Sequence, residues 1–121
     1  VRNDLTTTPL QALTLMNNKT FVEASRFLAE RMLKQGEKPA ERIAWAFRSV
    51  TSRNPNPDEL NLLLADLKLF ENEFKKNPGA VQKLLTIGER KADSKLPPTQ
   101  LAAYALIANT LLNLDEAIMQ N

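Results

Sequence analysis

Apolar side chains recur at spacings of three and four residues along most of this chain, which is the period of an amphipathic helix. Strict alternation of apolar and polar residues is not sustained over any useful length, so no sheet is expected. The stripes that predict helices are Phe21, Ala24, Leu28 and Met32 with Val22, Ala29 and Leu33 beside them; Ile43, Ala46, Phe47 and Val50; Leu60, Leu63, Leu67, Phe70 and Phe74; and Val81, Leu84 and Leu85.

Proline marks the expected start of each helix. Proline suits the first helical turn because its missing N–H would have no partner there and its φ is already near the helical value. The prolines in such places are Pro9, Pro39, Pro57, Pro78 and the pair Pro97-Pro98. Thr8, Asn56 and Asn77 each stand directly before one of them, and their side chains can accept a bond from a first-turn N–H. Polar linkers are expected at 35–38 and 89–95.

The last predicted helix, residues 99–119, differs from the others because apolar residues occur on every side of it. A helix that is apolar all round is a buried helix. We therefore expect an all-α fold, a single compact bundle of about five to six helices around a buried, apolar C-terminal helix. One domain over 1–121 accounts for the whole chain. The apolar stretch 101–114 is interrupted by Asn109, Thr110 and Asn113, so membrane insertion is not expected.

The composition excludes much chemistry. The chain has 121 residues, a net charge of +2, three glycines, and neither His nor Cys. Zinc sites, imidazole bases and cysteine nucleophiles are therefore ruled out within it, as are Gly-rich phosphate-binding loops. Asp115 and Glu116 are adjacent and point about 100° apart on a helix, so they do not share one site. No catalytic, cofactor or metal residue is predicted, and nucleic-acid binding is not expected without a dense basic stripe.

Charged side chains on the first long helix look like ordinary surface pairs. Glu23 and Arg26 are three residues apart, and Glu30 and Lys34 are four apart. Pairs at these spacings stabilise the solvent-facing side of a helix. Trp45 and Tyr104 are interpreted as core residues.

Two amides interrupt the last helix. Asn109 and Asn113 lie four residues apart on one face, and a buried amide without a partner costs about 1–3 kcal/mol. We interpret them as part of a polar network that fixes how the first and last helices dock, so Asn113→Leu is expected to destabilise the fold. The alternative is that these amides line a ligand groove. The candidate structural or docking residues are Thr8, Gln11, Asn17, Asn109, Asn113 and Asp115.

Three blocks of sequence resemble a known family. They are TTTPLQALTLMN at 6–17 with Phe21-Val22-Glu23-Ala24; Arg42-Ile43, Ala46-Phe47-Arg48, Arg53, Pro55, Pro57 and Glu59-Leu60; and Ala108-Asn109-Thr110-Leu111-Leu112-Asn113-Leu114-Asp115-Glu116. In combination they resemble the planctomycete cytochrome-c-associated C-terminal domain of unknown function.

The resemblance implies a piece from the C-terminal end of a larger, exported multidomain protein in a periplasmic or otherwise extracytoplasmic location. Any haem would lie in another domain of that parent, and this chain would hold no cofactor. The expected function is a non-catalytic interaction or structural module whose partners are the parent's other domains. Two alternatives remain open. One is a domain that binds extracellular polysaccharide, and the other is an accessory domain that completes an enzyme site with the preceding domain.

Overall fold

The computed structural model describes residues 19–88 and 90–120, with side chains described as far as Leu114. Five helices make up this part of the chain: α2 (Lys19–Met32), α3 (Pro39–Thr51), α4 (Pro57–Lys75), α5 (Pro78–Leu85) and α6 (Pro98–Gln120). No strand occurs among these described residues. The all-α bundle expected from the hydrophobic pattern is confirmed.

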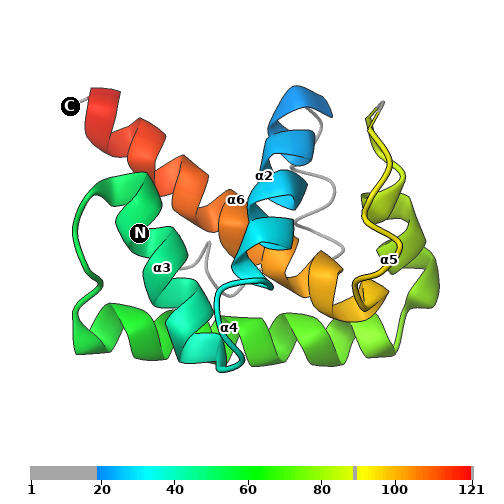
Figure 1. The fold of residues 1–121 in the computed structure, drawn as a ribbon, viewed down its shortest axis with the longest axis horizontal. Coiled ribbons are helices and arrows are strands. Elements are labelled where there is room, and N and C mark those ends of the chain that lie inside the picture. Colours follow the sequence, from blue (N-terminus) through cyan, green and yellow to red (C-terminus); the bar gives the residue numbers. More distant parts are fainter. Residues whose placement is uncertain (1–18, 89, 121) are drawn as a thin grey trace.

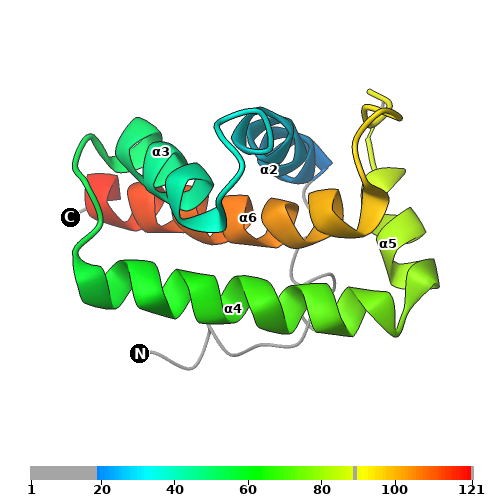
Figure 2. The same cartoon turned by 60° about the horizontal axis from the view of Figure 1, so that its bottom comes forward.

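Helix α6 is the centre of the bundle. It lies between α4 on one side and α2 and α3 on the other, with α5 near its first turns (Figure 2). Every residue from Leu101 to Ala108 is buried, and α6 contacts each of the other four described helices. Four of these eight residues are alanines, whose small side chains let the surrounding helices approach closely. None of the helices in the described part of the chain has the length and hydropathy needed to cross a membrane.

Four of the helices begin at the predicted prolines, namely Pro39, Pro57, Pro78 and Pro98. Two of the predicted caps also form. Asn56 Oδ1 accepts a hydrogen bond from Glu59 N at 2.8 Å, and Asn77 Oδ1 accepts one from Ala80 N at 3.2 Å. These bonds satisfy backbone donors that have no partner inside the helix. Thr8 and Pro9, which predict a further helix, lie outside the described residues.

The buried face of α2 differs from the predicted stripe. Val22, Ala29 and Met32 are buried as expected, but Ala24 is exposed and the polar Ser25 and Arg26 are buried in its place. The face is rotated because α2 packs along α6 on one side and meets the segment after α5 on the other (Figure 1). Burial of an arginine on this face is the first sign of a polar site.

Candidate functional site

Arg26 of α2 holds the segment that follows α5. Its side chain is only 2% exposed, and a guanidinium at such a depth needs hydrogen-bond acceptors. Its Nη1 donates to Leu85 O at 3.1 Å and to Ile87 O at 2.8 Å, and its Nη2 donates to Arg90 O. The acceptors are the carbonyl of Leu85, the last residue of α5, and the carbonyls of Ile87 and Arg90 in the irregular segment after it. The guanidinium N–H groups of Arg26 therefore bind carbonyls that would be bound by backbone N–H groups if the helix continued.

Other charged residues of α2 continue this contact. Glu23 Oε2 accepts from Arg90 N at 2.8 Å, and Glu30 Oε2 accepts from Asp93 N at 2.9 Å. Lys34, two residues beyond the end of α2, has its Nζ 3.7 Å from Asp93 Oδ2. We refer to Glu23, Arg26, Glu30 and Lys34 as the α2 clamp.

The prediction that these residues form surface pairs within α2 is wrong for Arg26, Glu23 and Glu30. Arg26 is buried, and both carboxylates bind backbone N–H groups of the distant segment 90–93. The physical reason is that irregular backbone next to a core must find hydrogen-bond partners, and the charged side of α2 is what faces it. Sequence reasoning missed the clamp, although the polar stretch at 89–95 did identify the irregular segment that needs it.

Gly88 lies where the clamp and the segment approach most closely. Its φ is +93°, a value that L side chains rarely adopt. A Cβ built at this position would also collide with the carboxyl group of Glu23. Both constraints require glycine here.

A pocket opens beside the clamped segment, between α5 and the start of α6. Its volume is about 560 Å³, within the range of small-molecule sites. Its wall includes the apolar residues Leu85, Leu96 and Leu101, and Arg90 and Lys91 also line it. The same backbone that the α2 clamp holds therefore shapes one wall of this pocket.

Arg42 links the turn before α3 to the central helix. Its Nε donates to Gly36 O at 3.0 Å, and its Nη1 donates to Tyr104 Oη at 3.4 Å. Its guanidinium carbon also lies 5.6 Å from the centre of the Tyr104 ring. Tyr104 is fully buried, as predicted for a core residue, and this burial raises the pKa of its hydroxyl against the smaller opposing effect of Arg42. Arg42 thus provides the buried hydroxyl with a polar partner.

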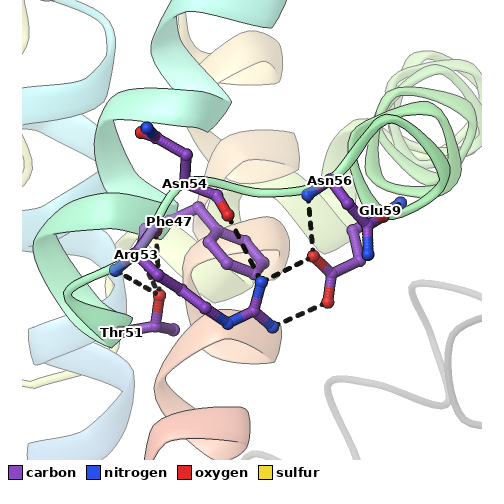
Figure 3. A network of polar contacts seen from close by, with 6 residues as sticks. All are labelled: Phe47, Thr51, Arg53, Asn54, Asn56 and Glu59. Atoms are coloured by element: carbon purple, nitrogen blue, oxygen red, sulfur yellow. Dashed lines mark hydrogen bonds and ion pairs between the residues drawn. The ribbon is translucent and has the colours of Figure 1, made fainter.

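Arg53 and Glu59 form the junction between α3 and α4 (Figure 3). Arg53 Nη1 and Nη2 donate to the two carboxylate oxygens of Glu59 at 2.9 and 2.8 Å, and the guanidinium carbon lies 4.9 Å from the centre of the Phe47 ring. Glu59 also accepts from Asn56 N at 2.9 Å. The Arg53 bonds, followed by the Asn56 bond, lower the pKa of Glu59 to about 2. The junction is therefore a charged structural turn that stays ionised at ordinary pH.

Asn109 and Asn113 take part in a chain of polar contacts between α6 and α2, whereas the predicted partners in the first predicted helix lie outside the described residues. Asn109 Nδ2 donates to Ser25 Oγ at 3.3 Å, Ser25 Oγ donates to Phe21 O at 2.9 Å, and Asn113 Nδ2 donates to Asn109 Oδ1 at 3.2 Å. Asn109 is half-buried and connects α6 to α2. Asn113, however, is exposed, so the expectation that it is a buried amide is wrong. The helix places Asn113 one turn further along, where the residues of α2 no longer cover it.

The remaining candidates are not placed by the structure. Thr8, Gln11 and Asn17 lie outside the described residues, as does the side chain of Asp115. The partner that sequence reasoning missed is Ser25. Its spacing of three from Val22 and four from Ala29 is the available signal, because it puts a hydroxyl on the apolar face of α2.

The side chains described between residues 19 and 114 contain no group of three or more Asp and Glu residues arranged to hold a metal ion. The described polar side chains discussed above bind backbone groups or one another. Their geometry stabilises helix ends, turns and the segment after α5.

Comparison with protein families gives a match to the first part of the chain. A family model described as PSD1, protein of unknown function (DUF1553), matches residues 1–67, which is more than half of the 121-residue chain. The match includes the first two blocks of the sequence resemblance and hence Arg42, Arg53 and Glu59, whereas the third block, at 108–116, lies beyond it. Curated proteins gave no match, and solved structures gave none. This chain belongs to the PSD1 family of proteins of unknown function, DUF1553.

Proposed function

We propose that this chain is a non-catalytic helical module that packs against another part of a larger protein. One observation carries the proposal: Arg42, Arg53 and Glu59, charged residues of the second block of the family resemblance, bind the chain's own turns and one another. Arg42 binds Gly36 O and Tyr104, and Arg53 binds Glu59. A catalytic residue must present its charged group to a substrate. In this stretch the charged groups instead hold helices α3, α4 and α6 in place.

The wider setting follows from the resemblance and is part of the proposal. The parent would be a large exported planctomycete protein associated with a cytochrome-c-like module. Haem would then bind in that module, and the helical bundle would contribute a rigid surface. The firm docking of α2, α3 and α4 on α6 supports such a role, because a preformed surface loses little conformational entropy on binding.

Reconstitution tests the contact role. The 121-residue chain and the remainder of its parent protein are produced as separate polypeptides, mixed at about 10 µM, and measured by size exclusion with light scattering. A complex with the summed mass is expected if the contact has the micromolar or tighter affinity of a specific interface. Separate elution of the two polypeptides at this concentration contradicts the proposal.

A second measurement tests the non-catalytic role. The isolated chain is incubated with p-nitrophenyl acetate, phosphate and glucoside, which report ester, phosphate and glycoside hydrolysis. Release of nitrophenol at the rate of a buffer blank is expected. Hydrolysis that scales with the concentration of the chain and survives repurification contradicts a non-catalytic module.

A further inference from the structure

Two arginine–aromatic contacts lie next to each other across the outer side of α2. The guanidinium carbon of Arg90 lies 5.3 Å from the centre of the Phe27 ring, and that of Arg31 lies 5.3 Å from the centre of the Trp45 ring. Phe27 and Arg31 are one helical turn apart and therefore share a face of α2. We refer to Arg90, Phe27, Arg31 and Trp45 as the arginine–aromatic ladder. It crosses from the segment after α5, over α2, to α3.

The ladder keeps a positive charge. Within the described residues, neither Arg31 nor Arg90 has a carboxylate partner for its guanidinium. The acidic residues of α2 on either side, Glu23 and Glu30, accept bonds from the backbone N–H groups of Arg90 and Asp93. Asp93 in turn pairs with Lys34. Glu23 and Glu30 therefore bind the backbone of the clamped segment.

The ladder is also held in position. The α2 clamp binds Arg90 on both sides of its backbone, since Glu23 accepts from its N–H and Arg26 donates to its carbonyl. Stacking on Phe27 and Trp45 further restricts the two arginine side chains. Phe27 itself is 46% exposed, the largest exposed fraction among the large apolar side chains described, so part of its ring is available to a partner. A fixed pair of cations with an apolar group between them has the features of a contact surface.

The orientation of the arginines identifies the chemistry of the partner. A guanidinium stacked on a ring leaves its N–H edges open, and these edges fit carboxylates in a two-bond geometry. Stacking of a sugar needs an open aromatic face, whereas an arginine lies over a face of both Phe27 and Trp45. We propose that the ladder binds an acidic protein segment that carries an apolar side chain for contact with Phe27. This inference rests on the proposed contact function and assigns a face and a partner chemistry to it.

Trp45 provides the measurement, because it is the only tryptophan in the chain and is part of the ladder. The full 121-residue chain is titrated with a twelve-residue peptide in which every third residue is leucine and the others are aspartate and glutamate. A saturable change in Trp45 emission is expected, and the affinity should fall as salt is raised. A control peptide with asparagine and glutamine in place of the acids should bind at least about tenfold more weakly, since charge-assisted bonds are lost.

Variants locate the binding face. Arg31→Gln and Arg90→Gln are each expected to weaken binding of the acidic peptide about tenfold. Lys75→Gln removes the same charge from the exposed end of α4 and should leave the affinity unchanged. Far-ultraviolet circular dichroism verifies that each variant is folded. Equal binding by the two arginine variants and wild type overturns the inference, as does equal binding of the two peptides.

Two further outcomes separate this inference from the contact function. If polygalacturonate changes Trp45 emission and the acidic peptide does not, the partner is an anionic polysaccharide and the inference is wrong. If the remainder of the parent protein binds wild type and the Arg31→Gln, Arg90→Gln double variant equally, the ladder is not the contact face. In that case the proposed function stands and the inference fails.

Discussion

Replacement of Arg26 by methionine tests the most consequential feature of the fold. Methionine is shorter than arginine but keeps an unbranched apolar stem in its place, and it removes every donor. The carbonyls of Leu85, Ile87 and Arg90 then lose the guanidinium that binds them. The substitution separates the hydrogen-bonding role of Arg26 from its contribution to packing.

The expected loss follows from these bonds. A hydrogen bond to a charged group contributes about 1.5–3 kcal/mol when it is buried. Ile87 is only half-buried and Arg90 is exposed, so water can replace part of the interaction at those carbonyls. Three bonds at the lower end of this range total about 4.5 kcal/mol, and access of water to two of the carbonyls reduces the loss expected for Arg26→Met to about 3 kcal/mol of unfolding free energy. For a domain of this size the unfolding temperature falls by about 10 °C.

Urea denaturation followed by circular dichroism measures the effect. The midpoint should fall by about 2 M if the slope is about 1.5 kcal/mol per M, as in other small domains. Hydrogen exchange adds a local readout, because the backbone amides of 86–95 should lose protection before those of α6 do.

Arg31→Met is the matched control for this experiment. It changes an exposed arginine of the same helix that makes one contact with Trp45, so a loss of about 0.5 kcal/mol is expected. If Arg26→Met unfolds within about 0.5 kcal/mol of wild type with an unchanged slope, the clamp does not stabilise the fold as reasoned here.

Three other predictions concern the turns and the amides. Because the pKa of Glu59 is lowered from 4.5 to about 2, its bond to Arg53 stabilises the fold fully above pH 4.5 and is lost as the pH falls toward 2. Both side chains are partly exposed, so the bond contributes little. Between pH 5 and 2 the free energy of unfolding of wild type should fall by only about 0.5–1 kcal/mol more than that of Glu59→Gln. Equal decreases for the two proteins in urea denaturation would argue against this role of the bond. Gly88→Ala should cost about 1–3 kcal/mol in thermal unfolding. Gly79→Ala, inside α5, should be neutral or slightly stabilising because the added Cβ would meet only Asn77 Oδ1, at an ordinary contact distance of 3.7 Å. Equal effects of the two substitutions would count against the close approach of Glu23. Asn109→Leu should lower the free energy of unfolding by about 1 kcal/mol, because it removes the bond to Ser25. Asn113 is exposed, so Asn113→Leu should lower it by no more than about 0.5 kcal/mol. A larger loss for Asn113→Leu than for Asn109→Leu in urea denaturation would show that the burial of these amides is misjudged.

The helices were predictable because their signals are local. Pro57 follows Asn56 and precedes Glu59, and these three residues suffice to start α4 wherever the helix later packs. The central place of α6 was also predictable, because Leu101 to Ala108 offers no polar face to water. Arg42 and Arg53 were identified as part of the family resemblance, but the groups that they bind were not.

The sites were less predictable because their partners are distant in the chain. Arg26 bonds to carbonyls 59, 61 and 64 residues away. The spacing of Arg26, four residues after Val22 and three before Ala29, puts it on the buried face of α2, whereas Arg31 lies exposed five positions later. That spacing does not show which carbonyls Arg26 binds. Asn109 could be identified as a polar residue that needs a partner. Its partner Ser25 could not be identified, because the two residues are 84 positions apart in the chain.

The amino-acid pattern determined the helical class of this protein, the starts of α3 to α6 and the burial of α6, since each depends on residues within one or two turns of each other. Only the tertiary structure decided which charged residues are structural and which face outward. A charged side chain becomes structural where it faces irregular backbone whose N–H and C=O groups need hydrogen-bond partners. The segment after α5 meets α2 on the side of Arg26, so Arg26 is buried as a donor while Arg31 and Arg90 remain on the surface as cations.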